Sequence, residues 1–405
     1  MNEIIRYEYL SELELLKNKH FIKVLTGIRR SGKSTILNQF KKILIKKYNV
    51  PINNIQIYDF NDKRLLTHNW KSLLNIMMDK SSHSEINYVF LDEIQEIKDF
   101  EKCIITLFEN KQFKYDIYIT GSNSKMFSEK LATLFTGRSA PINVFPISFK
   151  LFHEQLNNEY SNNSLFNKYL KYGGLGIIVP NYDEENLIQK TLKWVFDDTI
   201  NKDVKTRHRF QNIDILDKVI NFVYEHIGKK INATKIENYL KSQKEPKLTD
   251  KTISKYLTWI CESLVLHKIK YYDVKGKRIF KTKVKYYAGD LGLLSRILSF
   301  DTTKLLSYRL ENLVYLELRQ RGYEIYTFED RYEREIDFIA KKDNEIVYYQ
   351  VTKSLNENNY ERESRVLLDR KDGFEKIILT LENESRNNDG IKIINIVDWL
   401  LGTKK

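Results

Sequence analysis

The chain has 405 residues, of which 42% are hydrophobic and 13% aromatic, a composition that excludes a largely disordered protein and favours two to four folded domains. The formal net charge of +13 favours polyanionic partners such as nucleic acid. The two cysteines, Cys103 and Cys261, lack metal-ligand spacing, and no signal peptide or bilayer-spanning apolar run is recognisable, so we expect a cytoplasmic protein without a membrane partner.

A phosphate-binding loop is predicted near the N-terminus. The segment 27–34 reads G-I-R-R-S-G-K-S, which follows a short apolar run over 21–26 and precedes an amphipathic helix, the strand–loop–helix setting that the motif requires. Lys33 is expected to reach the β- and γ-phosphates of ATP, and the Ser34 hydroxyl to ligate Mg²⁺. The alternative is a glycine turn with a solvated lysine. The residues expected to contact the nucleotide are Gly27, Arg29, Arg30, Ser31, Gly32, Lys33, Ser34 and Thr35.

An acidic pair follows the hydrophobic run over 88–91. Asp92 is predicted to hold Mg²⁺ with Ser34, and Glu93 to polarise the attacking water, because parallel strands end at a common edge of their sheet. Such pairs are also common as loop residues. A small-molecule kinase shares the phosphate loop, but a strand-terminal Asp-Glu pair followed by a polar sensor strand favours a hydrolase.

Two further polar positions are candidates for the same site. The run over 116–119 leads into Thr120-Gly121-Ser122-Asn123, where Ser122 or Asn123 is expected to sense the γ-phosphate; the alternative is a turn that caps the next helix. Arg138 lies before another strand-like run and is a candidate arginine finger within this chain or across a subunit boundary. A surface ion pair is its alternative role.

The middle of the chain predicts a helical lid over 151–207 and a winged helix-turn-helix over 208–292. Three helical patterns precede two strand patterns joined by a basic glycine turn. The third helix would present Lys251 and Lys255 to DNA, although such modules also bind proteins. The turn would add Lys275, Lys277 and Arg278.

The region 293–405 resembles the PD-(D/E)xK nuclease fold. A helix near 310–318 precedes strands at 323–328, 335–340, 346–352 and 376–380. Asp337 and Gln350 occupy the metal positions, and Glu311 is placed to assist them. Thr352 stands where the lysine belongs, and alternation points Lys353 to the opposite face. We therefore expect a module that binds without cutting.

Nearly the whole chain resembles the AAA_14/DUF4143 family of prokaryotic AAA+-type ATPases. The resemblance rests on G-I-R-R-S-G-K-S-T, V-F-L-D-E-I-Q, I-T-G-S-N-S and T-G-R…V-F-P-I-S-F, and it continues through Tyr172-Gly173-Gly174 and Asp198-Thr199-Ile200. It implies an ATPase core over 1–150 and a C-terminal region that shares the nuclease fold.

The combined prediction is an α/β multidomain protein with a RecA-like P-loop core, a helical lid, a winged helix and a small nuclease-like domain. We expect Mg-ATP hydrolysis to control how the C-terminal modules engage DNA or a protein partner, with oligomerisation possible. The alternatives are an ATP-assisted nuclease and a nucleotide-gated signalling switch that acts on proteins.

Overall fold

Two compact units make up the protein. The computed structural model describes residues 3–122, 135, 137–156, 160–208, 210, 212–246, 248–273, 278–303, 305–355, 357–383 and 385–403. Unit 1 contains Met1–Val144 and Glu262–Leu264, and unit 2 contains Phe145–Cys261 and Val265–Lys405. None of the helices in the described segments is long and apolar enough to cross a bilayer. The four-domain division expected from the sequence stays a prediction.

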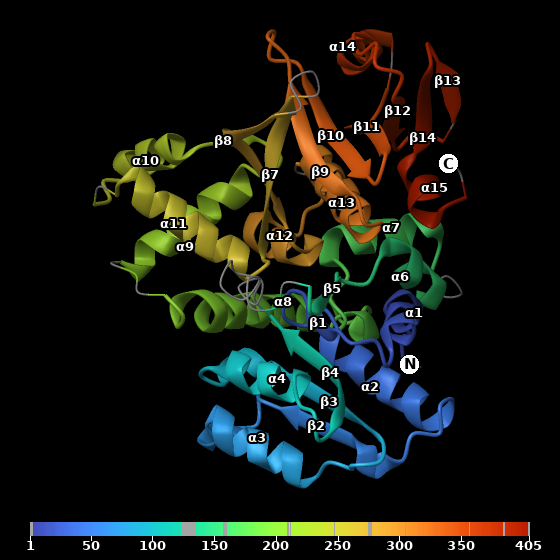
Figure 1. Cartoon of the computed structure of the whole chain (residues 1–405). Coiled ribbons are helices and arrows are strands. Elements are labelled where there is room, and N and C mark those ends of the chain that lie inside the picture. Colours follow the sequence, from blue (N-terminus) through green and yellow to red (C-terminus); the bar gives the residue numbers. More distant parts are fainter. Residues whose placement is uncertain are drawn as a thin grey trace. The chain divides into compact units, whose positions relative to one another are not determined.

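Unit 1 is a parallel sheet in the order β2-β3-β4-β1-β5, with every neighbouring pair of strands parallel (Figure 1). This confirms the α/β parallel-sheet core that the sequence predicts. Its strands are β1 (Ile22–Thr26), β2 (Ile55–Asp59), β3 (Ile86–Asp92), β4 (Lys114–Gly121) and β5 (Ser139–Asn143). Its helices are α1 (Tyr7–Leu16), α2 (Lys33–Lys46), α3 (Trp70–Asp79) and α4 (Phe100–Phe108), with short 3-10 helices η1 (Ile52–Asn54), η2 (Leu65–Thr67) and η3 (Ile94–Glu96).

Helices cover both faces of this sheet, because successive side chains of its strands point to opposite sides. Val24, Val89 and Ile117 pack in one core cluster with side chains of α3 and α4. Leu25, Phe90 and Tyr118 pack in a second cluster with side chains of α1 and α2 (Figure 1). The interior strands β1 and β3 are therefore buried along almost their whole length, which is why the sequence reveals them so clearly.

A buried ion pair ties β1 to β4. Lys23 is fully buried within β1, and its ammonium group pairs with the Asp116 carboxylate of β4 and also donates to the Lys19 carbonyl at 2.8 Å. Asp116 in addition accepts hydrogen bonds from the Asn18 amide at 2.9 Å and the Tyr118 hydroxyl at 2.8 Å. These partners compensate two charges that burial alone would make costly, and they fix β1 beside β4.

Unit 2 is built on a mixed sheet in the order β13-β14-β12-β11-β10-β9-β7-β8-β6. Its strands are β6 (Lys230–Ile231), β7 (Leu266–Asp273), β8 (Arg278–Ala288), β9 (Glu324–Glu329), β10 (Glu335–Lys342), β11 (Glu345–Val351), β12 (Glu375–Thr380), β13 (Arg386–Asn388) and β14 (Ile391–Asn395). The β7–β8 hairpin forms as expected. Because β7 also pairs in parallel with β9, at Lys270 opposite Tyr326, the hairpin belongs to the same sheet as the C-terminal strands (Figure 1).

Several helices of unit 2 begin where asparagine, aspartate or serine caps them. Side-chain oxygens of Ser161, Asn212, Asn232, Asp290 and Asn395 accept hydrogen bonds from backbone amides of α7, α9, α10, α12 and α15, respectively. The helices are α6 (Phe149–Leu156), α7 (Asn162–Tyr172), α8 (Glu185–Thr199), α9 (Ile213–Glu225), α10 (Ala233–Ser242), α11 (Asp250–Glu262), α12 (Leu291–Leu298), α13 (Leu306–Gln320), α14 (Glu357–Leu368) and α15 (Ile396–Leu401), with η5 (Val179–Asn181) and the π-helical turn η6 (Ile200–Lys205).

The glycine pair after α7 lets that helix end against the start of α12. Gly173 has φ +71°, and a Cβ there would lie 2.4 Å from both carboxylate oxygens of Asp290. Gly174 donates its amide to Asp290 at 2.9 Å, and a Cβ on Gly174 would lie 2.1 Å from the Ile147 carbonyl oxygen. Burial raises the pKa of Asp290 to about 6, against hydrogen bonds from backbone amides that favour its charged form. The Tyr-Gly-Gly motif is therefore a packing element of unit 2.

Candidate nucleotide-binding site

The phosphate-loop motif connects the carboxyl end of β1 to the first turn of α2. Gly27 lies so close to the chain at Val144 that a Cβ would stand 2.2 Å from the Val144 carbonyl oxygen. Gly32 caps α2 in the left-handed region, with φ 101°. Both positions therefore require glycine, one for space and one for conformation. A glycine turn of this kind at the N-terminus of a helix suits phosphate oxygens, because such turns expose backbone amides.

The donor groups of the loop fit a bound phosphate. The Ser31 hydroxyl is buried and has no hydrogen-bond partner among the described residues, so it is available to a ligand. The Lys33 ammonium group is buried and donates to the carbonyls of Gly27 at 2.9 Å and Ile28 at 3.3 Å. Ser34 and Thr35 are exposed in the first turn of α2, as a ligand contact requires.

The two arginines of the loop differ in placement. Arg29 is half-buried and interacts electrostatically with Glu93. Arg30 is exposed, and its backbone is in the left-handed region with φ 66°. Arg29 therefore faces the acidic pair, whereas Arg30 lies at the outer surface of the loop.

Asp92 ends β3 beside the start of α2. Its carboxylate accepts hydrogen bonds from the hydroxyls of Ser34 and Thr120. Burial raises the pKa of Asp92, and these two hydrogen bonds act against that rise. A hydroxyl and a carboxylate on neighbouring elements suit Mg²⁺, which keeps several water ligands and needs few from the protein. Ser34 and Asp92, separated by 58 positions in the sequence, thus meet as expected.

Glu93 is a buried carboxylate held beside the phosphate-loop lysine. Its Oε1 lies 3.5 Å from the Lys33 ammonium nitrogen, and the Gln95 side-chain amide donates to its Oε2. Burial acts to raise the pKa of Glu93, but the charges of Lys33 and Arg29 and the hydrogen bonds of Gln95 and Ser122 outweigh it, so the pKa is lowered. The Glu93 side chain is therefore an anion at neutral pH.

The backbone of Glu93 is strained, with φ 55°, a conformation that a non-glycine residue adopts at a cost. The Glu93 amide donates to the Thr120 hydroxyl at 2.9 Å, and Thr120 in turn donates to Asp92. Thr120 thus fixes both acidic residues through one hydroxyl group. Sequence reasoning did not select it, although it is the first polar side chain after the apolar run 117–119.

Ser122, a predicted sensor, is buried and hydrogen bonds to Glu93. Asn123, the other candidate, lies outside the described residues. The choice between them stays a prediction.

Comparison with known proteins places this site in a family. Residues 19–153 match AAA_14, an AAA domain, and residues 163–304 match DUF8612, a domain of unknown function. An uncharacterized protein of Haemophilus influenzae is 35% identical over 407 residues, which cover 98% of this chain and 98% of the relative. The chain belongs to the AAA_14 family. The DUF4143 part of the resemblance stays a prediction.

Other similarities of this AAA_14 protein are more distant. An uncharacterized protein of Methanocaldococcus jannaschii is 31% identical over 400 residues, covering 96% of this chain and 84% of the relative. A Walker-type ATPase of Pyrococcus abyssi has a TM-score of 0.49 at 14% identity, covering 73% of this chain and 96% of that one. At that TM-score the likeness adds nothing to the family assignment.

Arg138 lies at the opposite edge of the AAA_14 core from the phosphate loop. Its carbonyl accepts a hydrogen bond from the amide of Ile22, the first residue of β1. The phosphate loop, by contrast, follows Thr26, the last residue of that strand. Its exposed guanidinium group pairs with Glu109 at 2.8 Å. Strand direction therefore separates Arg138 from the site within its own chain, and the geometry does not support the cis arginine finger. A role across a subunit boundary stays a prediction.

In unit 2 of this AAA_14 protein, the residues predicted to resemble a nuclease site lie close together, but their side chains hydrogen bond to groups of the protein itself. The Gln350 side-chain oxygen accepts a hydrogen bond of 3.2 Å from the Asp337 backbone amide. The Asp337 carboxylate accepts one of 2.8 Å from the Val351 amide. The Thr352 hydroxyl donates to the Ser354 carbonyl at 3.0 Å. Lys353 is exposed and Thr352 is buried, but both residues follow the end of β11 at Val351, so the strand's alternation does not determine their orientation.

Proposed function

We propose that this AAA_14 protein is a Mg-ATP hydrolase whose nucleotide state controls how unit 2 engages DNA or a protein partner. The observation that carries the hydrolase proposal is the meeting of Lys33, Glu93 and Asp92 at one edge of the sheet, with Glu93 3.5 Å from the Lys33 nitrogen. Mg²⁺, held by Ser34 and Asp92, would neutralise charge on the phosphates.

The side chains of the site have separate roles in this proposal. Lys33 binds the β- and γ-phosphate oxygens, and the Ser31 hydroxyl donates to a phosphate oxygen. Glu93 orients a water molecule toward the γ-phosphate and accepts its proton. Thr120 holds both acidic residues in position through the hydrogen bonds described above.

Because Lys33 pairs with Glu93 in the absence of nucleotide, nucleotide binding should change the interactions of Glu93. Phosphate oxygens compete with the Glu93 carboxylate for the Lys33 ammonium group. When phosphate binds, Glu93 loses its pairing with Lys33 and becomes free to accept a proton from water. Binding and activation of the carboxylate are therefore linked through Lys33.

Glu93→Gln tests the hydrolase proposal. Because the amide keeps the shape but cannot accept a proton, we expect hydrolysis to fall by about 10²–10⁴-fold while ATP affinity measured by calorimetry remains. Glu96→Gln is the matched control, because this side chain lies three positions away and is exposed. A Glu93→Gln protein that still hydrolyses ATP at the wild-type rate would refute the assignment.

We propose that α9, α10, α11 and the β7–β8 hairpin act as a winged-helix module. Lys251 and Lys255 are exposed on α11, and the net charge of +13 supports binding to a polyanion. Lys275 and Lys277 lie outside the described residues, as does the Arg278 side chain. DNA is the partner that this charge favours, and a protein partner is the alternative.

The DNA proposal predicts a change in the salt dependence of binding. Replacing Lys251 and Lys255 by alanine should reduce the slope of log K against log salt concentration by about 2, since each phosphate contact contributes about 1. Lys190 and Lys193, exposed on α8, give a control pair with the same loss of charge. An equal effect of both pairs would argue against a specific role for α11.

Coupling to nucleotide is tested separately. DNA affinity of the wild type should change on addition of ATP, whereas Lys33→Ala should hold one affinity in both conditions. If the wild type binds DNA equally with and without ATP, the coupling proposal fails even though hydrolysis persists.

A further inference from the structure

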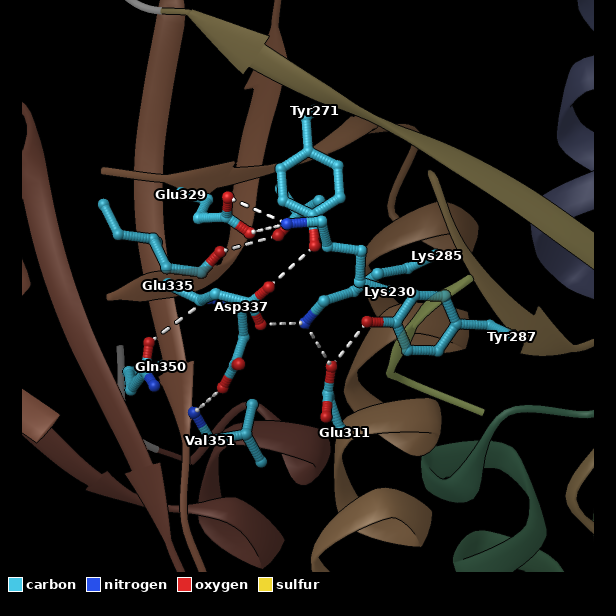
Figure 2. Close-up of polar contacts among 12 residues, drawn as sticks. Lys230, Tyr271, Lys285, Tyr287, Glu311, Glu329, Glu335, Asp337, Gln350 and Val351 are labelled. Atoms are coloured by element: carbon cyan, nitrogen blue, oxygen red, sulfur yellow. Dashed lines mark hydrogen bonds and ion pairs between the residues drawn. The ribbon is translucent and has the colours of Figure 1, made fainter. Parts of the chain in front are cut away.

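A buried lysine lies among the acidic side chains of unit 2. Lys285 comes from β8 and is 1% exposed. Its ammonium nitrogen is 2.8 Å from Glu335 Oε2 and 3.5 Å from Glu311 Oε1 (Figure 2). It also interacts electrostatically with Asp337. The two ion-pair partners come from different elements, Glu335 from β10 and Glu311 from α13.

Two tyrosines complete the polar partners of this cluster. The Tyr287 hydroxyl donates to Glu311 Oε1 at 2.5 Å, and the Tyr271 hydroxyl donates to Glu335 Oε1 at 2.6 Å (Figure 2). Each of the two carboxylates that pair with Lys285 thus also accepts a hydrogen bond from a tyrosine hydroxyl. Burial acts to lower the pKa of Lys285, but Glu311, Asp337 and Glu335 outweigh it and raise that pKa, so the ammonium form persists.

The side chains expected to bind a divalent cation do not fit one here. The only side-chain oxygen of Gln350 accepts a hydrogen bond from the Asp337 amide (Figure 2). The side-chain nitrogen of Gln350 donates to Glu363 at 3.0 Å. Across the described parts of the chain, no three His, Cys, Asp or Glu side chains are grouped to hold a metal.

Lys285 supplies the positive charge that a bound metal ion would otherwise provide to these carboxylates. An ammonium group is a compact charge with three donors, so it can pair with carboxylates on two elements at once. A divalent ion among the same oxygens would lie beside this fixed positive charge and would be repelled by it. We propose that the Lys285 ammonium group occupies the cation position of the cluster formed by Glu311, Glu335 and Asp337, which makes this part of unit 2 independent of divalent metal.

Mn²⁺ binding to the full-length chain tests this proposal. All proteins carry Asp92→Asn, which removes the metal position proposed in the nucleotide site, and no nucleotide is added. Free Mn²⁺ is measured by electron paramagnetic resonance. We expect Lys285→Met to bind one more Mn²⁺ than its parent, and Lys285→Met/Asp337→Asn to lose that ion. Lys270→Met is the matched control, because Lys270 is exposed on the neighbouring strand β7.

The outcomes separate clearly. If Lys285→Met is unfolded alone but folds when Mn²⁺ is added, as judged by circular dichroism, the metal has replaced the ammonium group and the proposal is supported. If Mn²⁺ neither binds to Lys285→Met nor restores its fold, the proposal is overturned. It is also overturned if the parent protein binds a Mn²⁺ ion that Glu311→Gln removes. None of these results depends on ATP hydrolysis.

Discussion

Replacing Lys33 by methionine should destabilise unit 1 even without nucleotide, because the change leaves Glu93 buried beside fewer cations. The two charges are 3.5 Å apart, and their side chains are 4% and 9% exposed. At an effective dielectric constant of about 20, that separation gives an attraction of about 5 kcal/mol. Arg29 still compensates Glu93 in the variant. We therefore expect a loss of about 3 kcal/mol, the lower end for breaking a buried pair.

Hydrogen exchange followed by mass spectrometry measures this loss of stability in unit 1 itself. Peptides that cover β1 and α2 report the stability of unit 1 separately from unit 2. Lys42→Met is the matched control on the same helix, because Lys42 pairs with Glu3 at 2.6 Å but both side chains are largely exposed. That shorter but solvated pair should contribute only about 0–1 kcal/mol.

A double-mutant cycle isolates the pair itself. Glu93→Gln removes the charge that Lys33→Met leaves unpaired, so the double variant should be more stable than the sum of the two single losses predicts. The coupling should also weaken in acid: the pKa of Glu93 is lowered on folding, so its contribution is present above its ordinary pKa and is lost as pH falls through the folded value. Additivity of the two substitutions within about 0.5 kcal/mol would refute the reasoning.

Three further changes probe other contacts. Gly174→Ala should lower the stability of unit 2 by about 1–3 kcal/mol in denaturant titration, because its Cβ would lie 2.1 Å from the Ile147 carbonyl oxygen; wild-type stability would contradict that packing. Burial raises the pKa of Asp290 from 3.8 to about 6, so wild-type stability should fall by about 3 kcal/mol as pH rises between those values. Asp290→Asn should lack this fall, and identical pH profiles would exclude Asp290 as its source. Thr120→Val should reduce kcat by about 10–100-fold with little change in nucleotide affinity, since the hydroxyl positions the proposed water-orienting carboxylate. Restoration by Thr120→Ser would confirm the hydroxyl's role, and an unchanged kcat in Thr120→Val would rule it out.

The meeting of the phosphate loop and the acidic pair was predictable because both follow parallel strands. Gly27 comes directly after β1, and Asp92 is the last residue of β3, so strand direction alone brings them to one edge. The same rule, applied fully, separates Arg138 from them. Arg138 precedes β5, and a residue before a parallel strand lies at the other edge of the sheet. The residue types around Arg138 do not indicate at which end of the sheet it lies, whereas its position directly before a strand does.

Thr120 was harder to predict because its role depends on which strands are neighbours. A polar residue near the end of an apolar strand is common, and nothing local in 114–121 indicates a partner. The hydroxyl gains its function because β4 lies beside β3 in the sheet, which brings it to Asp92 and to the amide of Glu93. Strand order is a tertiary property, so sequence patterns restricted to one segment do not contain it.

Lys285 shows the same limit for a buried charge. In β8 it alternates with Val284 and Tyr286, a pattern that ordinarily places lysine on a solvated face. That face is instead covered by α13, whose Glu311 pairs with it. Thr352 shows only that the segment after β11 supplies no lysine there, whereas the β7–β8 hairpin supplies the positive charge through Lys285. Because Lys285 pairs with carboxylates from α13 and β10, the hairpin that carries it stabilises the cluster, and pairing of β7 with β9 holds this hairpin in the same sheet as β10.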